Sequence, residues 1–271
     1  MSPPRSVFLL LALLLAVLTY SAASQTPPQP PDEARFDSGI AHALAGEFDQ
    51  ARTEIEAYRE RAAYSVPARE VLSVVDDVEA GRIEVETAAP MFRGIAFFNK
   101  DEQDEAIAEF DQALSGAPGY ARAYYNRGIA LWQGRGQDDK AIVEFTKVLE
   151  LEPDNDDAYT SRGGAHEDRG EFEEAIADYS SAIELNPTAV YALFSRGSAY
   201  YRREIAEPAL ADLTKAIELD PNFANSYNYR GLLYMRVIRD RFKACPDWKR
   251  ACELGLCQNY RLARTRGLCV A

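Results

Sequence analysis

The sequence has few of the residues on which catalytic and metal sites usually depend. Among 271 residues there are two histidines, His42 and His166, and neither belongs to an HExxH zinc motif. Residues 134–136, Gly-Arg-Gly, are typical of a turn rather than of a glycine-rich loop that holds a phosphate. These absences argue against an enzyme, and we predict no catalytic residue, no metal site and no cofactor.

Basic residues are also scarce. The chain has 30 lysine and arginine residues against 43 aspartate and glutamate residues, so its formal net charge is −13. Proteins bind polyanions mainly through clusters of positive charge. Nucleic acids and anionic membrane surfaces are therefore not expected as partners, unless a groove in the folded chain concentrates positive charge locally.

Long apolar runs are absent except near the start of the sequence. The run from Val7 to Leu18 follows Arg5 and precedes small residues at 21–23, which is the order of regions in a secretory signal peptide. Because the run is short for a membrane span, we predict a cleaved signal peptide at residues 1–23, with an uncleaved anchor as the alternative. Residues 24–31 contain four prolines and are predicted to be an extended linker. The mature chain is thus expected to be secreted or periplasmic, without an integral membrane span.

Cysteine is missing from most of the sequence. All four copies, Cys245, Cys252, Cys257 and Cys269, lie within the last 27 residues, and an even number in an exported chain suggests disulfides. If residues 246–254 are helical, Cys245 and Cys252 lie about 10 Å apart along the axis, which disfavours a bond between them. A turn at Gly255 and a short helix at 259–266 would return Cys269 to Cys245. We therefore predict the pairs Cys252–Cys257 and Cys245–Cys269, with a zinc site as the alternative.

What the sequence does contain is an internal repeat. A glycine recurs with a period of about 34 residues, the length of a helix-turn-helix unit. After Gly163 follow an alanine at Ala175, an aromatic residue at Tyr179 and a proline at Pro187. The second unit has one additional residue, which we place in its turn at 134–136. The repeated glycines are Gly94, Gly128, Gly163, Gly197 and Gly231.

The spacing suggests how the two helices of one unit pack. A glycine opposite an alanine lets antiparallel helices approach closely, and an aromatic residue four positions after the alanine fills the space beneath them. Proline then ends the second helix. One unit cannot bury its apolar stripe alone, so the units are expected to stack on one another. Arrays of this kind usually bind other molecules rather than catalyse reactions.

These units resemble the tetratricopeptide repeat. The resemblance is carried by Tyr-Asn-Arg-Gly at residues 125–128 and Ala-Ile-Ala-Asp-Tyr at residues 175–179. It implies an all-α fold, a right-handed solenoid of helix-turn-helix repeats whose first helices line a concave groove for peptides or partner proteins. The predicted segments are a degenerate repeat or helical cap at 32–86, five repeats at 87–120, 121–155, 156–189, 190–223 and 224–255, and a cysteine-containing C-terminal cap at 256–271.

An arginine precedes each repeated glycine, and an acidic residue precedes each aromatic residue or leucine. One interpretation is an arginine ladder that binds anionic groups of a ligand. The other is that each arginine packs between the helices and pairs with the acidic residue of its own unit, and we favour this structural interpretation. The arginines are Arg93, Arg127, Arg162, Arg196 and Arg230, and the acidic residues are Glu109, Glu144, Asp178, Asp212 and Asp247.

The resemblance also places side chains of the first helices on the wall of the groove. Aromatic and arginine side chains dominate binding hot spots, although some aromatic residues at these positions are expected to be structural. The predicted groove residues are Phe98, Arg122, Tyr125, Asn126, Trp132, Phe194, Tyr201, Arg202, Asn228, Tyr229 and Arg236, and the wider set on the same helices includes Glu167 and Tyr191. The carboxylate clamp with which some members of the family hold a peptide C-terminus is not expected, because only Asn126 of its residues is present.

Two functions fit these observations. The first is an exported, non-catalytic scaffold that binds a peptide or helix of an envelope partner protein in the concave groove. The second is a self-associating structural or assembly component of the cell envelope, a homo-oligomer in which the convex face or the ends of the array connect the copies. An enzyme that uses the acidic turns is the least favoured alternative.

Overall fold

The computed structural model describes residues 33–60, 65–134 and 136–269. The predicted signal peptide and linker, residues 1–31, lie outside this part of the chain. All regular structure within the described residues is helical, which confirms the all-α prediction. Within the same residues, no helix combines the length and the apolar composition that a membrane span requires.

The described residues up to Asp76, 33–60 and 65–76, form a compact unit of their own. This first unit contains α2 (Glu33–Leu44), α3 (Phe48–Arg59) and most of α4 (Val66–Glu79). A Cβ atom added at Gly39 would lie 2.6 Å from the Ile55 side chain, so α2 and α3 cross closely at this glycine. The segment before the five repeats therefore contains a helical hairpin that is packed through a glycine.

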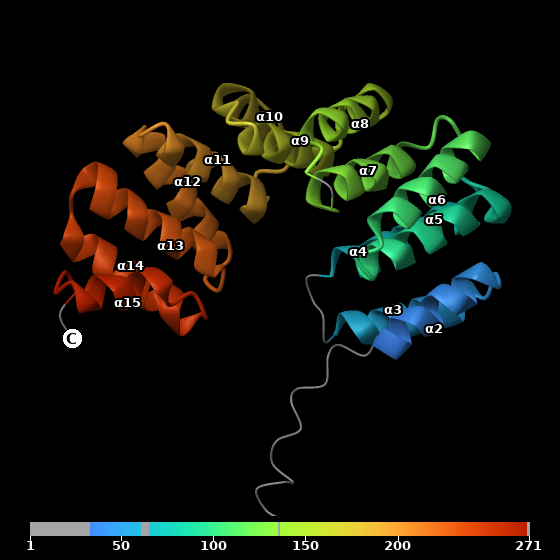
Figure 1. Ribbon diagram of the computed structural model, residues 1–271, viewed down its shortest axis with the longest axis horizontal. Helices are drawn as coiled ribbons and strands as arrows, with labels where there is room; N and C mark the ends of the chain where they lie inside the picture. Colours follow the sequence, from blue (N-terminus) through green and yellow to red (C-terminus); the bar gives the residue numbers. More distant parts are fainter. Residues whose placement is uncertain (1–32, 61–64, 135, 270–271) are drawn as a thin grey trace, which may run out of the picture. The chain divides into compact units, whose positions relative to one another are not determined.

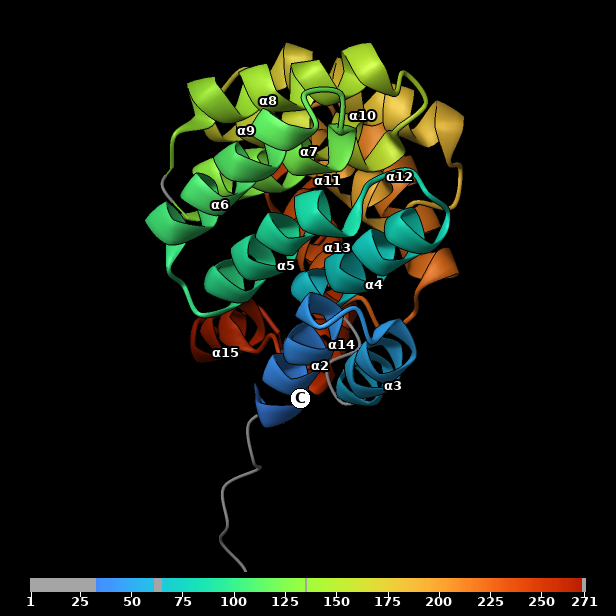
Figure 2. The same cartoon turned by 90° about the vertical axis from the view of Figure 1, so that its right-hand side faces the viewer.

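In the described residues from Asp77 onward, the second unit consists of the end of α4, a row of five helical hairpins and a short helix (Figure 1). The two helices of each hairpin contact each other, and each second helix contacts the first helix of the next hairpin. Figure 2 shows the row with the first hairpin toward the viewer. The hairpins are α5 (Val85–Asn99) with α6 (Gln103–Gly116), α7 (Ala121–Ile129) with α8 (Asp138–Leu151), α9 (Asp156–Asp168) with α10 (Phe172–Leu185), α11 (Val190–Arg202) with α12 (Ala206–Leu219), and α13 (Ala224–Leu233) with α14 (Arg241–Glu253); the last helix is α15 (Gln258–Thr265).

The repeated glycines lie where the two helices of a hairpin cross. A Cβ atom added at Gly163 would lie 2.8 Å from the ring of Tyr179, and the other four glycines are similarly close to Phe110, Phe145, Leu213 and Trp248. The glycine therefore faces the large side chain of the second helix and, next to it, the backbone of the alanine that the spacing placed opposite. The backbone oxygen of Ala175 is further from the Gly163 position, at 3.2 Å. A side chain at these glycines would have to displace a buried side chain.

The arginine before each glycine pairs with the acidic residue of its own hairpin. Arg162 donates to Asp178 from Nε at 2.8 Å and from Nη2 at 2.7 Å, and its Nη1 donates to Thr146 of the preceding hairpin at 3.1 Å. This confirms the structural interpretation and shows that the arginine also links successive hairpins. The other pairs within hairpins are Arg93–Glu109, Arg127–Glu144, Arg196–Asp212 and Arg230–Asp247.

Two hairpins have a different turn. The first helices of the second and fifth repeats continue into π-helices, η1 (Ala130–Gly134) and η2 (Tyr234–Ile238). The amide of Gln137 donates to the carbonyl of Leu131, whereas the amide of Glu171 in the third repeat donates to His166, one residue nearer along the chain. The end of the helix therefore takes up the additional residue of the second repeat, which the sequence placed in the turn at 134–136. The fifth repeat has the same enlarged turn, and its Arg230 and Asp247 are 17 residues apart, like Arg127 and Glu144, against 16 residues in the other repeats.

Two disulfide bonds connect the C-terminal segment. Cys245 is joined to Cys269, with 5.6 Å between their Cα atoms, and Cys252 is joined to Cys257. This is the predicted pairing, and no described cysteine is left as a thiolate for the alternative zinc site. Helix α15 lies beside α14 (Figure 1) and shares a small core with it around Trp248 and Ala263.

Candidate functional site

Five aromatic side chains gather at the first helices of the fourth and fifth repeats. The ring centre of Phe194 lies 5.2 Å from those of Phe223 and Tyr229 and 6.1 Å from that of Tyr191. Tyr201 extends the group at 5.9 Å from Tyr229. Tyr191 exposes 58% of its surface, so the group is open to solvent at this edge. We call these five residues the aromatic cluster.

The structure brings together three predicted groove residues in this cluster, Phe194, Tyr201 and Tyr229. Tyr191 belonged to the wider set. Phe223 was missed because it directly precedes α13 as its N-cap residue, whereas the family pattern points to positions inside the first helix. An aromatic residue just before the start of a repeat was the signal that could have found it.

A partly buried carboxylate lies close to the aromatic cluster. Glu167 on α9 accepts hydrogen bonds from the hydroxyl of Tyr179 at 3.0 Å and from the hydroxyl of Ser198 at 3.2 Å. Burial raises the pKa of Glu167, although these hydrogen bonds and the charge of Arg202 oppose the shift. The other repeats have Phe98, Trp132, Tyr201 and Met235 at the equivalent position. An ionisable group with a shifted pKa, at a position where the other repeats have an aromatic residue or methionine, is a candidate functional residue.

The surface around Tyr191 is acidic. The pKa of Tyr191 is raised, first by desolvation and then by the negative charges of Glu167 and Asp168. Arg202, a predicted groove residue, is exposed and its positive charge acts on Glu167. The aromatic cluster therefore has two carboxylates, Glu167 and Asp168, and one cation, Arg202, as neighbours.

Trp132 is part of the packing between the second and third repeats. A Cβ atom added at Gly164 would overlap its ring, so the glycine provides the space that the indole occupies. The ring meets Phe145 edge-on at 6.3 Å, and Nε1 donates to Asp168 at 2.7 Å. A substitution of Trp132 would therefore test the packing of the repeats as much as ligand binding.

Arg122 is used in an ion pair with Asp77. The Asp77 carboxylate is almost completely buried and accepts hydrogen bonds from Arg122 at 2.9 Å, from Tyr120 at 2.5 Å and from Arg82 at 2.6 Å. Burial by itself raises the pKa of Asp77, but the three donors outweigh it, and the pKa is lowered. Arg122 thus holds the residue that begins the second unit, and its side chain remains 31% exposed.

Three other predicted groove residues are also used in packing. Tyr125 is 9% exposed, and its hydroxyl lies 3.2 Å from that of Ser161. Asn126 is 8% exposed and donates to the backbone oxygen of Arg122. Phe98 packs against the core of the second repeat. Tyr125 and Asn126 are therefore largely covered, whereas Phe98 is half-buried.

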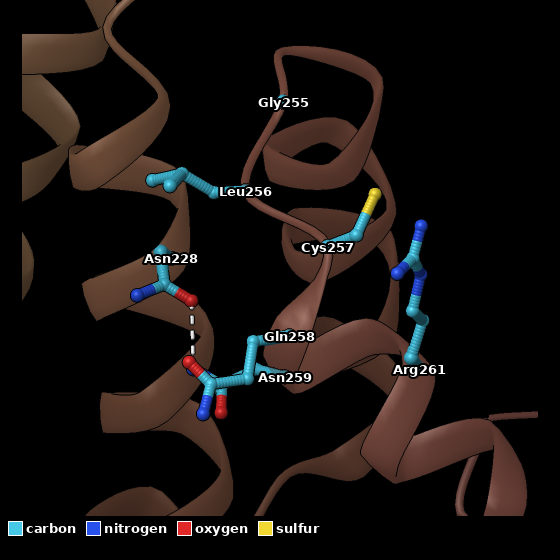
Figure 3. A pocket seen from close by; sticks show the side chains of 7 residues that line it. All are labelled: Asn228, Gly255, Leu256, Cys257, Gln258, Asn259 and Arg261. Carbon is cyan, nitrogen blue, oxygen red and sulfur yellow. Dashed lines mark hydrogen bonds between the residues drawn. The ribbon is translucent and has the colours of Figure 1, made fainter.

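Asn228 lies in a separate pocket at the C-terminal end of the array. Its Oδ1 accepts a hydrogen bond from Asn259 at 2.7 Å, and its backbone oxygen accepts one from Trp248 at 3.2 Å. The pocket has a volume of about 540 Å³ and is also lined by residues 255–259 and Arg261 (Figure 3). Asn228 therefore helps to hold α15 and is not part of the aromatic cluster. Arg236, the last predicted groove residue, is exposed on η2.

The histidines have structural partners. His166 Nδ1 lies 2.7 Å from Glu171 across the turn of the third repeat, and His42 Nδ1 lies 2.6 Å from Glu47 in the same arrangement. Among the described residues, no group of three or more histidine, cysteine and acidic side chains is placed to hold a metal ion.

Two family models match the chain. Residues 93–156 match a model described as tetratricopeptide repeat, and residues 163–203 match a model described as TPR repeat. The matched ranges fall within the first four of the five hairpins of the second unit. A sequence comparison with curated proteins finds no match.

Several solved structures share the fold. The crystal structure of MamA protein is 23% identical with a TM-score of 0.56, and the match covers 70% of this chain and 100% of that one. A MamA structure from Desulfovibrio magneticus RS-1 is 21% identical with a TM-score of 0.57, over 64% and 97% of the two chains. YrrB, described as a TPR protein with an unusual peptide-binding site, is 21% identical with a TM-score of 0.55, over 71% and 97%. At these identities the similarity concerns the fold alone.

Proposed function

Because this chain carries an array of tetratricopeptide repeats, we propose that it is a non-catalytic scaffold that binds a peptide segment or helix of a partner protein at the aromatic cluster. The observation that carries the proposal is the cluster itself, five rings from successive repeats that are open to solvent at Tyr191. Rigid aromatic side chains supply large contact areas at a small entropic cost, and they dominate binding hot spots. The peptide-binding site of YrrB shows that a protein of this fold can have such a role.

The charges beside the cluster favour a partner segment with a basic side chain next to an apolar one. The rings of Tyr191 and Phe194 can contact an apolar side chain, and their faces also attract a cation. Glu167 and Asp168 supply negative charge on the neighbouring helix. A partner cation would compensate the desolvation of Glu167, which the fold alone compensates only in part. We therefore expect an arginine or lysine of the partner over Tyr191.

A library of random peptides tests this binding site directly. The purified chain is used to enrich segments from the immobilised library, and the best segment is then titrated by calorimetry. Enriched segments are expected to contain a basic residue next to an apolar one. Tyr191→Ala should weaken binding by about tenfold or more without changing thermal unfolding, because this ring is a solvent-exposed anchor.

The matched control is Val143→Ala. Val143 is 65% exposed, and it lies on α8, a second helix, away from the cluster residues on α11 and α13. Its substitution should change neither binding nor stability. If Tyr191→Ala and Tyr201→Ala both bind the selected segment as tightly as the unsubstituted chain, the aromatic cluster is not the binding site.

The proposed place of action is outside the cytoplasm, with a partner in the cell envelope. This rests on the apolar run near the start of the sequence and on the two disulfides, because disulfides persist in oxidising compartments. Cell fractionation with mass spectrometry of the N-terminal peptide should find the chain in the envelope or secreted fraction, starting near Ser24. An intact N-terminus in the cytosolic fraction would contradict it.

A further inference from the structure

Charge is distributed unevenly along the chain. Residues 87–223, the first four repeats, contain 13 basic and 26 acidic residues, a formal charge of −13. Residues 224–271, the fifth repeat and the C-terminal cap, contain 10 basic and 3 acidic residues, a formal charge of +7. The total charge of the chain conceals this positive end.

The positive charge is exposed and is not compensated locally. Each of the three acidic residues of this end already pairs with one cation: Asp247 with Arg230, Asp240 with Lys243 and Glu253 with Arg250. Seven further cations are exposed, and none of them forms an ion pair within the described part of the chain. They are Arg236, Arg239, Arg241, Lys249, Arg261, Arg264 and Arg266.

The fold gathers several of these cations at one place. Arg239 and Arg241 lie at the start of α14, and Arg264 and Arg266 lie at the end of α15. The disulfide between Cys245 and Cys269 holds these two segments together. Phe242, the residue after Arg241, is 78% exposed and has the Arg241 guanidinium 5.1 Å from the centre of its ring. We call Arg239, Arg241, Phe242, Arg264 and Arg266 the basic end.

The same chain has an acidic counterpart. The turn between α5 and α6 together with the first turn of α6, which we call the α5–α6 turn, presents four exposed acidic residues within five positions. It belongs to the first hairpin of the second unit, whereas the basic end belongs to the fifth hairpin and α15 (Figure 1). Three further hairpins separate the two surfaces along the row. The acidic residues are Asp101, Glu102, Asp104 and Glu105.

We propose that the basic end of one copy binds the α5–α6 turn of a second copy, so that copies of this chain associate head to tail. Opposite charges steer two such surfaces together, and the exposed ring of Phe242 supplies an apolar anchor within the contact. Because the two surfaces differ, the contact is heterologous, and each assembly keeps one basic end and one acidic turn available for further copies. This association uses neither the aromatic cluster nor Glu167, so it is independent of the proposed peptide binding.

Two neutralised variants test the proposal. The first is Arg239→Gln/Arg241→Gln/Arg264→Gln, and the second is Asp101→Asn/Glu102→Gln/Glu105→Gln. All six residues are exposed, so both variants are expected to fold, which circular dichroism checks. In sedimentation velocity at low salt, the unsubstituted full-length chain should show concentration-dependent oligomers and each variant alone should be a monomer. An equimolar mixture should form a 1:1 dimer, because each variant keeps the surface that the other has lost.

The control and the salt dependence separate this contact from other kinds of association. Lys140→Gln/Arg203→Gln/Lys215→Gln removes three exposed cations from the acidic repeats and should leave the oligomers unchanged. Raising the salt concentration from about 50 mM to about 300 mM should weaken the association by about tenfold. A chain that is monomeric at every concentration, or two variants that do not pair when mixed, would overturn the proposal. If the chain is monomeric but binds vesicles of anionic lipid, and the first variant does not, the basic end is a membrane-binding surface instead.

Discussion

The fourth and fifth repeats have the same internal contacts but different surfaces. In each, a glycine faces a large side chain, Leu213 for Gly197 and Trp248 for Gly231. In each, an arginine donates two hydrogen bonds to the acidic residue of its own hairpin. The fifth repeat differs in its π-helical turn, its disulfides and its excess of basic residues.

The difference shows which positions of the array can change. Each repeat contacts only the repeats next to it in the row. The residues that hold a hairpin together and stack it on its neighbours therefore recur in every repeat, whereas exposed residues can differ. Functional residues are then to be sought where one repeat departs from the others. Glu167, at a position where the other repeats have an aromatic residue or methionine, and the basic end are two such departures.

The largest expected effect tests the shared contacts. Gly197→Leu and Gly231→Leu should each lower the free energy of unfolding by about 3 kcal/mol, because the added side chain overlaps a buried one. Urea unfolding followed by circular dichroism measures both. Gly119→Ala is the control, because a Cβ atom there meets nothing within 4 Å. A stable Gly231→Leu variant beside an unstable Gly197→Leu variant would show that the two hairpins are packed differently.

The disulfides should matter only at the fifth repeat. Cys245→Ser/Cys269→Ser opens a link across 24 residues and should cost about 3 kcal/mol, and Cys252→Ser/Cys257→Ser, across 5 residues, about 2 kcal/mol. Hydrogen exchange should accelerate in α14 and α15 and stay unchanged in α11 and α12. Faster exchange in the fourth repeat as well would mean that the cap stabilises the whole array.

The arginines before the repeated glycines allow a closer comparison of the fourth and fifth repeats. Arg196→Ala and Arg230→Ala should each cost about 2 kcal/mol, since each leaves a buried acidic residue without its main donor. Double-mutant cycles with Asp212→Ala and Asp247→Ala, measured by thermal unfolding, should give similar coupling energies. Loss of peptide binding with unchanged unfolding of Arg196→Ala would instead support the ligand-binding interpretation of the arginines.

The smallest expected effect concerns the position that holds Glu167 in the third repeat and Met235 in the fifth. The folded pKa of Glu167 is raised, so its charged form lowers stability once the pH rises above about 4, the ordinary range of a glutamate. Glu167→Gln should therefore be slightly more stable than the unsubstituted chain at neutral pH, and this difference should vanish in acid. Thermal unfolding between about pH 4 and pH 8 measures it. A less stable variant at neutral pH would mean that the carboxylate stabilises the fold.

Much of the fold could be predicted because its contacts lie within one repeat. Gly163 and Tyr179, or Arg162 and Asp178, are 16 residues apart in the chain, and a helix-turn-helix unit brings such positions together wherever it occurs. The disulfide pairing followed from the same helix geometry. The site was less predictable, since Arg122 meets Asp77, Trp132 meets Gly164 and Phe194 meets Phe223 across longer separations.

The sequence by itself determined the repeat, its all-helical form and the cysteine pairs, because these depend on the spacing of residues along helices. Only the tertiary structure decided which of the predicted groove residues remain accessible. It showed that Arg122, Tyr125 and Trp132 are used in packing, and that Tyr191 and Phe223 join Phe194 in the aromatic cluster. The physical reason is that a side chain is available to a ligand only if no neighbouring hairpin has already covered it, and spacing within one repeat does not contain that information.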